Sequence, residues 1–295
     1  MPDLSSDLGH RLRSHIDTLA GTIGERNLMR PDAYCAAAGY LRNTWRAMGY
    51  AVTEQAFPSD GTRVMNLEVV RDGARLAHEI ILLGAHYDTV RGSPGADDNA
   101  SGVAALLEIS RLLAAAEPAR TVRFVAFANE ELPFFMRDDM GSLVYARAAR
   151  ARGDDVRLMI SLEMLGYYTD APDSQHYPPP LAPFYPGTGN FIGFVSNFRS
   201  QRELRRLVKA FRTSSDFPSE YLSTFESVTG VSQSDHAAFW KQGYRAVMVT
   251  DTAFYRYPFY HTAHDTPEKL DYPRFAQVTT GLAKAVLMLA DERRW

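Results

Sequence analysis

Histidine and carboxylate residues follow an apolar run in the segment Ile81–Glu108, whose sequence is ILLGAHYDTVRGSPGADDNASGVAALLE. His86 and Asp88 come directly after the apolar residues, and Asp97 and Asp98 follow a Ser-Pro-Gly turn before an apolar helix. Imidazole and carboxylate groups are ligands for zinc and other divalent ions. A histidine at a strand tip and an aspartate at a helix entrance, a short loop apart, therefore predict the first half of a metal site.

Ionisable residues also follow three later apolar runs: Glu130 and Glu131 after TVRFVAFA, Glu163 after LMISL, and Asp251 after AVMVT, with Tyr260 and His261 further on. In open α/β sheets, ligands bind beyond the carboxyl ends of the strands. Each residue alone has a common structural explanation, such as a solvated turn or a helix cap. Glu163 differs, because an ionised carboxylate between MISL and ML is costly unless it is paired or bound to metal. Four strand ends of this kind predict one metal-binding edge of the sheet.

Two histidines and three carboxylates suit a pair of divalent ions, and zinc fits this donor set. Two ions need one carboxylate that bridges them, and such ions lie about 3.5–4 Å apart. A further carboxylate close to the metals can then accept the proton of the attacking water. Adjacent glutamates can divide these two tasks.

The elements that must position these residues alternate between helix and strand from residue 79 onward. Expected helices are 5–25, 31–48, 101–116, 141–152, 202–211 and 273–291, and expected strands are 51–57, 65–70, 79–85, 121–128, 158–164, 191–196 and 246–250. We expect a turn at Asp72–Gly73 between the second and third strands, and an irregular loop over residues 167–190. The alternation predicts a single three-layer α/β/α domain over residues 1–295, with a mixed, mostly parallel central sheet.

The composition of the 295-residue chain excludes several classes of protein. It is 45% hydrophobic with a net charge of −3 and no basic cluster, so nothing favours a nucleic-acid partner. No run of 18 apolar residues and no apolar leader segment is visible, so we expect no membrane partner and a cytoplasmic location. The single cysteine, Cys35, excludes an internal disulfide and a thiolate zinc cage, and we expect it to be buried. The oligomeric state is left open.

The motifs GAHYDTV, PGADDNASGVAALLE, FANEEL, SDHAAF and YHTAHDT resemble, in order and spacing, those of the co-catalytic dizinc exopeptidases. That family includes bacterial leucyl aminopeptidases, glutamate carboxypeptidases and, with a single zinc, glutaminyl cyclases. The resemblance covers residues 79–270, and the closing helix also fits. It implies the zinc-exopeptidase fold and two zinc ions per chain, with one ion as the alternative.

The resemblance also implies a role for each site residue. Five residues match the metal ligands, with Asp98 as the bridge between the ions: His86, Asp98, Glu131, Glu163 and His261. Three residues match catalytic roles: Glu130 as general base, Tyr260 as the hydroxyl that stabilises the oxyanion, and Asp88 as the carboxylate that fixes the tautomer of His86. Asp97 matches a position that binds no metal. Asp235, in the SDH motif, fits either a helix cap or an indirect role in the site.

Two features depart from the family pattern. Glu163 stands where the family usually has aspartate, and it is one methylene longer. Residues 133–140, PFFMRDDM, are an insert that begins beside the predicted base. We expect this insert and the loop 167–190 to shape the substrate pocket, with Phe134, Phe135 and Met136 as candidates for an apolar wall.

The predicted function is that of a metal-dependent exopeptidase. An aminopeptidase that acts on peptides or aminoacyl compounds through zinc-activated water is favoured over two alternatives. A glutaminyl-cyclase-like acyltransferase with one zinc needs only part of the ligand set. A carboxypeptidase or amidohydrolase of the same family needs a cation for the substrate carboxylate, which Arg137 or Arg256 can supply. A serine hydrolase is disfavoured, because GVSQS at Gly230–Ser234 lacks the second glycine of a nucleophile elbow.

Overall fold

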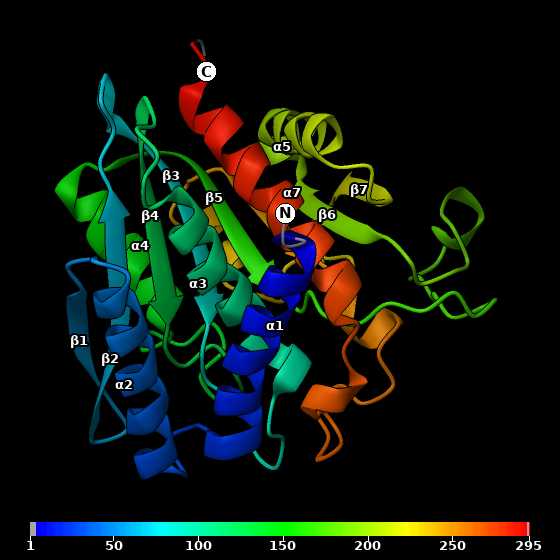
Figure 1. Ribbon diagram of the computed structural model, residues 1–295, viewed down its shortest axis with the longest axis horizontal. Coiled ribbons are helices and arrows are strands. Elements are labelled where there is room, and N and C mark those ends of the chain that lie inside the picture. Colours follow the sequence, from blue (N-terminus) through cyan, green and yellow to red (C-terminus); the bar gives the residue numbers. More distant parts are fainter. Residues whose placement is uncertain (1–3, 294) are drawn as a thin grey trace.

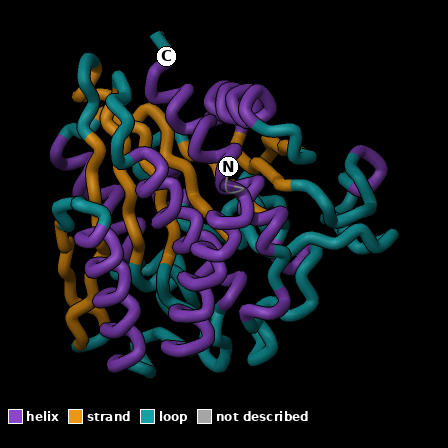
Figure 2. Tube along the Cα trace, in the orientation of Figure 1, coloured by secondary structure: helices purple, strands orange, loops and turns teal. Residues whose placement is uncertain are grey.

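A mixed sheet of eight strands lies at the centre of the computed structural model, which describes residues 4–293 and 295 (Figures 1 and 2). The strands are β1 (Thr53–Ser59), β2 (Thr62–Arg71), β3 (Leu76–His86), β4 (Arg120–Phe127), β5 (Asp155–Glu163), β6 (Ile192–Asn197), β7 (Ser219–Thr224) and β8 (Ala246–Thr250). Their order across the sheet is β1-β2-β4-β3-β5-β8-β6-β7. The pairs β3/β4, β3/β5, β5/β8 and β6/β7 are parallel, whereas β1/β2, β2/β4 and β6/β8 are antiparallel. The predicted mixed, mostly parallel sheet is confirmed.

Helices cover both faces of this sheet (Figure 1). They are α1 (Leu4–Ile16), α2 (Pro31–Ala47), α3 (Gly102–Leu113), α4 (Gly141–Arg152), α5 (Gln201–Ser214), α6 (His236–Lys241) and α7 (Tyr272–Asp291). Helices α1, α2, α3, α5 and α7 share one core with the sheet, and α4 and α6 share another with its opposite face. The three-layer α/β fold is therefore confirmed. Within the described residues, no helix is long and apolar enough to cross a membrane.

Strand β3 shows why its sequence is apolar at almost every position. Ile81 and Leu83 belong to the core beneath α3 and α7, whereas Ile80 and Leu82 belong to the core beneath α4 and α6. Successive side chains of a strand point to opposite faces, so a strand covered on both sides needs apolar residues throughout. His86, the polar residue at the carboxyl end of β3, follows the last of these apolar positions.

The expected turn at Asp72–Gly73 does not join neighbouring strands, because β4 lies between β2 and β3. Gly73 is needed for close packing instead, since a Cβ there would lie 2.6 Å from the carbonyl carbon of Arg120. The hairpin of this region joins β1 to β2. Its turn is Asp60–Gly61, with φ values of 43° and 78°, as a tight primed turn requires.

Several local expectations also differ from the structure. The first helix ends at Ile16, and a short π-helical segment, η1 (Asp17–Ile23), follows it. Strand β7 and helix α6 were not predicted, because SEYLST lacks a clear apolar run and α6 has only six residues. Cys35 is exposed rather than buried. The buried stripe of α2 instead consists of Tyr34, Ala37, Ala38, Leu41 and Trp45.

Candidate metal centre

A first group of metal-donor atoms forms where β3 and β5 end. His86 is the last residue of β3, Glu163 is the last residue of β5, and Asp98 lies in the short segment η2 (Ala96–Ser101) before α3. Nε2 of His86 lies 3.4 Å from Oδ1 of Asp98 and 3.4 Å from Oε2 of Glu163. The extra methylene of Glu163 therefore still allows its carboxylate to reach this group.

A second group shares Asp98 with the first. Nε2 of His261 lies 3.0 Å from Oδ2 of Asp98 and 3.4 Å from Oε2 of Glu131. Within each group, the donor atoms lie within 4.8 Å of one another. Asp98 thus turns one oxygen toward each group, which is the geometry of a carboxylate that bridges two ions.

The electrostatics of the centre favour bound cations. Nε2 of His86 is fully buried and has no hydrogen-bond partner. Burial opposes the charged form of His86, but the nearby Glu163 and Glu130 carboxylates outweigh this and raise its pKa well above the ordinary value. A buried cluster this rich in carboxylate is stable only with compensating positive charge. Two imidazoles and several carboxylates are a donor set that fits zinc.

Glu130 is close to the centre but belongs to neither donor group. Its Oε2 lies 3.9 Å from Nε2 of His86. Burial is the main cause that raises the pKa of Glu130 well above its usual range. A carboxylate placed in this way can exchange a proton with a water molecule without leaving a metal.

Asp88 contacts both His86 and the backbone of the Glu130–Glu131 segment. Its Oδ1 and Oδ2 accept hydrogen bonds from the backbone N–H groups of Glu130 and Glu131, both at 3.0 Å. The backbone carbonyl oxygen of Asp88 lies 3.3 Å from Nδ1 of His86, within hydrogen-bond distance, and its carboxylate Oδ1 lies 3.6 Å from the same atom. Asp88 is therefore close to the side of His86 that faces away from the donor group, where a carboxylate can orient the ring.

Tyr260 directly precedes His261 in the sequence and lines the cleft beside the centre. Its ring stacks on the His261 ring with 3.7 Å between the centroids. Burial raises the pKa of its hydroxyl well above the ordinary value, so the group stays a hydrogen-bond donor. Its role toward an oxyanion stays a prediction.

The carboxylate of Glu163 is hydrogen-bonded by Ser234, a residue that was not predicted to belong to the site. Ser234 Oγ donates a 2.6 Å hydrogen bond to Oε2 of Glu163, and Ser161 Oγ lies 3.0 Å from Ser234 Oγ. Ser234 begins the SDH motif, so its position next to Asp235 was the available signal. Asp235 itself is fully buried and makes no capping hydrogen bond to α6. Burial raises its pKa to about 7.

The backbone of the loop that carries Asp98 is hydrogen-bonded to Asp265. Asp265 accepts hydrogen bonds from the backbone N–H groups of Asp97 at 2.8 Å and Asp98 at 3.1 Å. Asp265 belongs to the YHTAHDT motif, but the sequence analysis gave it no role. These two bonds fix the backbone from which the shared carboxylate projects.

Arg26 fixes the same loop at its base. It is fully buried and donates to the carbonyl groups of Tyr87 at 2.8 Å, Pro94 at 2.6 Å and Gly95 at 2.8 Å. Nothing around Arg26 in the sequence marks this role, because these three partners lie more than 60 positions away.

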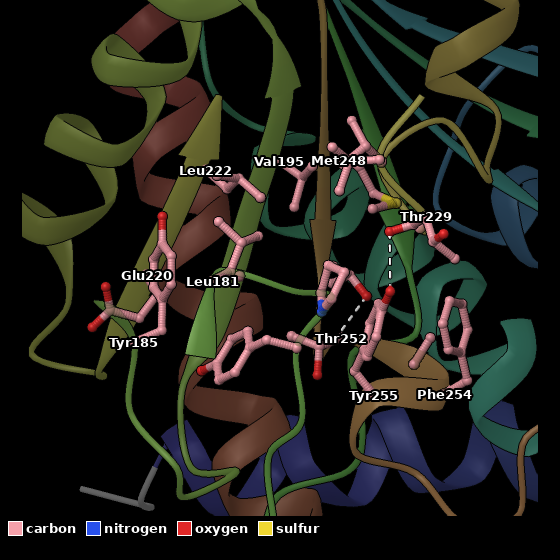
Figure 3. Close-up of a pocket in the computed structure, with 18 of the residues that line it drawn as sticks. Leu181, Tyr185, Val195, Glu220, Leu222, Thr229, Met248, Thr252, Phe254 and Tyr255 are labelled. Atoms are coloured by element: carbon pink, nitrogen blue, oxygen red, sulfur yellow. Dashed lines mark hydrogen bonds between the residues drawn. The ribbon is translucent and has the colours of Figure 1, made fainter. Parts of the chain in front are cut away.

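A cleft opens beside the metal centre (Figure 3), and Glu163 and Tyr260 are among its lining residues. Loop 167–190 contributes Tyr177, Leu181 and Tyr185 to its wall, as predicted. The insert 133–140 does not line this cleft, and its expected role in shaping a substrate pocket stays a prediction. Phe135 and Met136 pack instead against a small core of Met140, Leu143 and Ala238.

Neither predicted cation lines this cleft. Arg256 is buried, its Nε donates to Oε1 of Gln175 at 2.8 Å, and its guanidinium lies over the Phe191 ring. Arg137 pairs with Asp60 at the surface. Among the described residues that line the cleft there is no lysine or arginine.

Comparison with known proteins identifies the class of the chain: it belongs to peptidase family M28, which it matches over residues 66–286. It is 38% identical to the uncharacterized protein YfbL of Escherichia coli over 281 residues, which are 92% of this chain and 85% of that protein. It is 25% identical to leucine aminopeptidase 1 of Ajellomyces dermatitidis over 274 residues, covering 85% of this chain and 66% of the relative. The predicted exopeptidase family is thereby confirmed.

Solved structures support the same fold. BSAP, a zinc aminopeptidase from Bacillus subtilis, superimposes with a TM-score of 0.73 at 16% identity, over 97% of this chain and 95% of that one. Fimbriiglobus ruber glutaminyl cyclase superimposes with a TM-score of 0.71 at 19% identity, over 95% of both chains. Because the same fold serves an aminopeptidase and a cyclase, it does not by itself choose between the two reactions.

Proposed function

We propose that this protein is a zinc-dependent aminopeptidase that removes N-terminal residues from peptides or aminoacyl compounds. The observation that carries the proposal is the pair of donor groups that share Asp98, with Glu130 beside them and a cleft in front. His86, Asp98 and Glu163 would hold one zinc ion, and Asp98, Glu131 and His261 the other. Relatives named aminopeptidases support the type of reaction.

The chain's own residues supply the proton transfers. Zinc ions in such a centre lower the pKa of water to about 7 and polarise the carbonyl of the scissile bond. Glu130 accepts the proton of the attacking water and returns it to the leaving amine. The Tyr260 hydroxyl donates a hydrogen bond to the oxyanion of the tetrahedral intermediate.

The charge of the site favours an aminopeptidase over a carboxypeptidase. An aminopeptidase must hold the free ammonium group of its substrate, and the carboxylates of Glu130 and Glu163 can accept hydrogen bonds from it. A carboxypeptidase needs a cation for the substrate carboxylate, and neither lysine nor arginine is among the described lining residues of the cleft.

Metal content and a substrate scan test this proposal together. We expect two zinc ions per chain by elemental analysis and hydrolysis of aminoacyl p-nitroanilides with a free amino group. N-acetylated versions of the same substrates are the matched controls and should not react. Activity on the blocked substrates alone would reject the proposal. One zinc per chain with cyclisation of N-terminal glutamine would indicate a glutaminyl-cyclase-like enzyme instead.

A further inference from the structure

One transverse row of the sheet runs from the metal centre to the far end of the cleft. Glu163 of β5 pairs with Thr250 of β8, Thr250 with Gly193 of β6, and Gly193 with Glu220 of β7. Residues paired across strands project to the same face of a sheet. With neighbouring strands about 4.8 Å apart, the Glu163 and Glu220 backbones lie roughly 14 Å apart on that face. All four residues of the row line the cleft.

The space between the two carboxylates is lined mainly by apolar residues, with Thr250 as the polar member of the row. Gly193 has no side chain, and a Cβ at this position would lie 3.5 Å from Cγ2 of Thr252, which also lines the cleft. The next row along the same strands, Met248–Val195–Leu222, also faces the cleft. Leu181 and Tyr185 of loop 167–190 also line the cleft (Figure 3). These surfaces form an apolar channel between the metal centre and Glu220.

Glu220 closes this channel with a negative charge. Figure 3 shows it beside Tyr185, at the opposite side of the cleft from Phe254 and Tyr255. The structure gives its half-buried carboxylate no hydrogen bond or ion pair with any described residue. Burial and, after it, the charge of Glu220 raise the pKa of the Tyr185 hydroxyl. A half-buried carboxylate without a partner at the end of an apolar channel can bind a cation that arrives with the substrate.

We propose that the cleft binds the side chain of an N-terminal lysine or arginine, with its alkyl stem along the apolar channel and its charged head paired with Glu220. This inference rests on the proposed aminopeptidase function and names its substrate class. Long cationic side chains bury their methylene groups on apolar surface while the head stays at a polar end. A leucine side chain is shorter and carries no charge, so it would leave Glu220 without a partner.

The p-nitroanilides of L-lysine and L-norleucine test the proposal, because they share a four-carbon side chain and differ by the ammonium group. We expect the zinc-loaded enzyme to have a higher kcat/KM for lysine. Glu220→Gln should lower the lysine-to-norleucine ratio of kcat/KM about tenfold, the size expected for a lost charged hydrogen bond, and mainly through KM. Glu220→Asp should restore part of the ratio. Asp216→Asn, which removes an exposed carboxylate outside the cleft, should leave the ratio unchanged.

Two outcomes would overturn the inference while leaving the aminopeptidase function intact. One is a wild-type preference for norleucine, and the other is a ratio that Glu220→Gln does not change. If the zinc-loaded protein hydrolyses no aminoacyl substrate, the proposed function fails. Calorimetry then tests the role of Glu220 without catalysis. The role is rejected if wild type binds lysinamide no more tightly than norleucinamide. It is also rejected if wild type binds lysinamide no more tightly than Glu220→Gln does.

Discussion

Glu130 provides the sharpest test of chemistry at the scale of single residues. Because its carboxylate belongs to neither donor group, Glu130→Gln should leave the zinc content unchanged. Loss of a general base should lower kcat by about 10²- to 10⁴-fold. Elemental analysis and steady-state kinetics on the same preparation measure both quantities. Full turnover by the variant would exclude Glu130 as the base.

Ser234 offers a second residue-scale test, because it acts on the centre only through Glu163. Ser234→Ala removes the 2.6 Å hydrogen bond that orients this carboxylate. We expect affinity for one of the two proposed zinc ions to fall about 10- to 100-fold. Ser232→Ala is the matched control, since Ser232 bonds the carbonyl group of Glu226 outside the centre. Zinc titrations in a metal buffer would show the difference, and equal affinities of the two variants would contradict the role of Ser234.

At the scale of elements, the loop between β3 and α3 depends on Arg26. Arg26→Met would remove the hydrogen bonds to several carbonyl groups, among them those of Tyr87, Pro94 and Gly95, and each buried carbonyl group left without a donor costs about 1–3 kcal/mol. We expect a lower free energy of unfolding and weaker zinc binding, because the loop carries Asp98. Arg75→Met removes an exposed arginine and serves as the control. Urea unfolding should separate the two variants by at least about 2 kcal/mol; similar midpoints would show that the loop holds without Arg26.

A buried hydrogen bond between His15 of α1 and Glu108 of α3 makes stability depend on pH. Burial opposes ionisation of Glu108, but hydrogen bonds from His15 and Arg111 outweigh it and lower the pKa of the carboxyl group. Its contribution is therefore present above the unfolded-state pKa of about 4.3 and is lost as the pH falls through the lower folded-state pKa. Glu108→Gln should destabilise the protein at pH 7, and the difference from wild type should shrink toward pH 3. A difference that is constant over this range in chemical denaturation would contradict the assignment.

At the scale of the whole molecule, removal of zinc should destabilise the fold. Four carboxylates, Asp98, Glu130, Glu131 and Glu163, meet in a buried centre at the strand ends. A ligand that binds only the folded state stabilises it by about 2.7 kcal/mol at 100 times its Kd. A chelator should therefore lower Tm, and added zinc should restore it. A Tm that is independent of zinc would contradict a metal site in this centre.

The sequence predicted the inner strands better than the edges of the sheet. Strands β3, β4 and β5 are apolar on both faces, so each shows an uninterrupted run. Strand β7 lies at an edge and mixes polar and apolar residues, which left no clear signal. The prediction that β2 and β3 are neighbouring strands was also wrong. A turn sequence at Asp72–Gly73 does not specify that a later strand, β4, will be inserted between two earlier ones.

The sequence by itself determined which side chains stand at strand ends, and it predicted the fold class and the exopeptidase family. These properties are local, because apolar runs, helix entrances and motif spacing can be recognised along the chain. The tertiary structure decided which of these side chains meet. It placed Asp98 between two donor groups, set Arg26 and Asp265 against its loop, and put Glu220 on the same row as Glu163. Strand order creates these contacts, and the pairing of strands distant in sequence depends on packing of the whole sheet rather than on any local pattern.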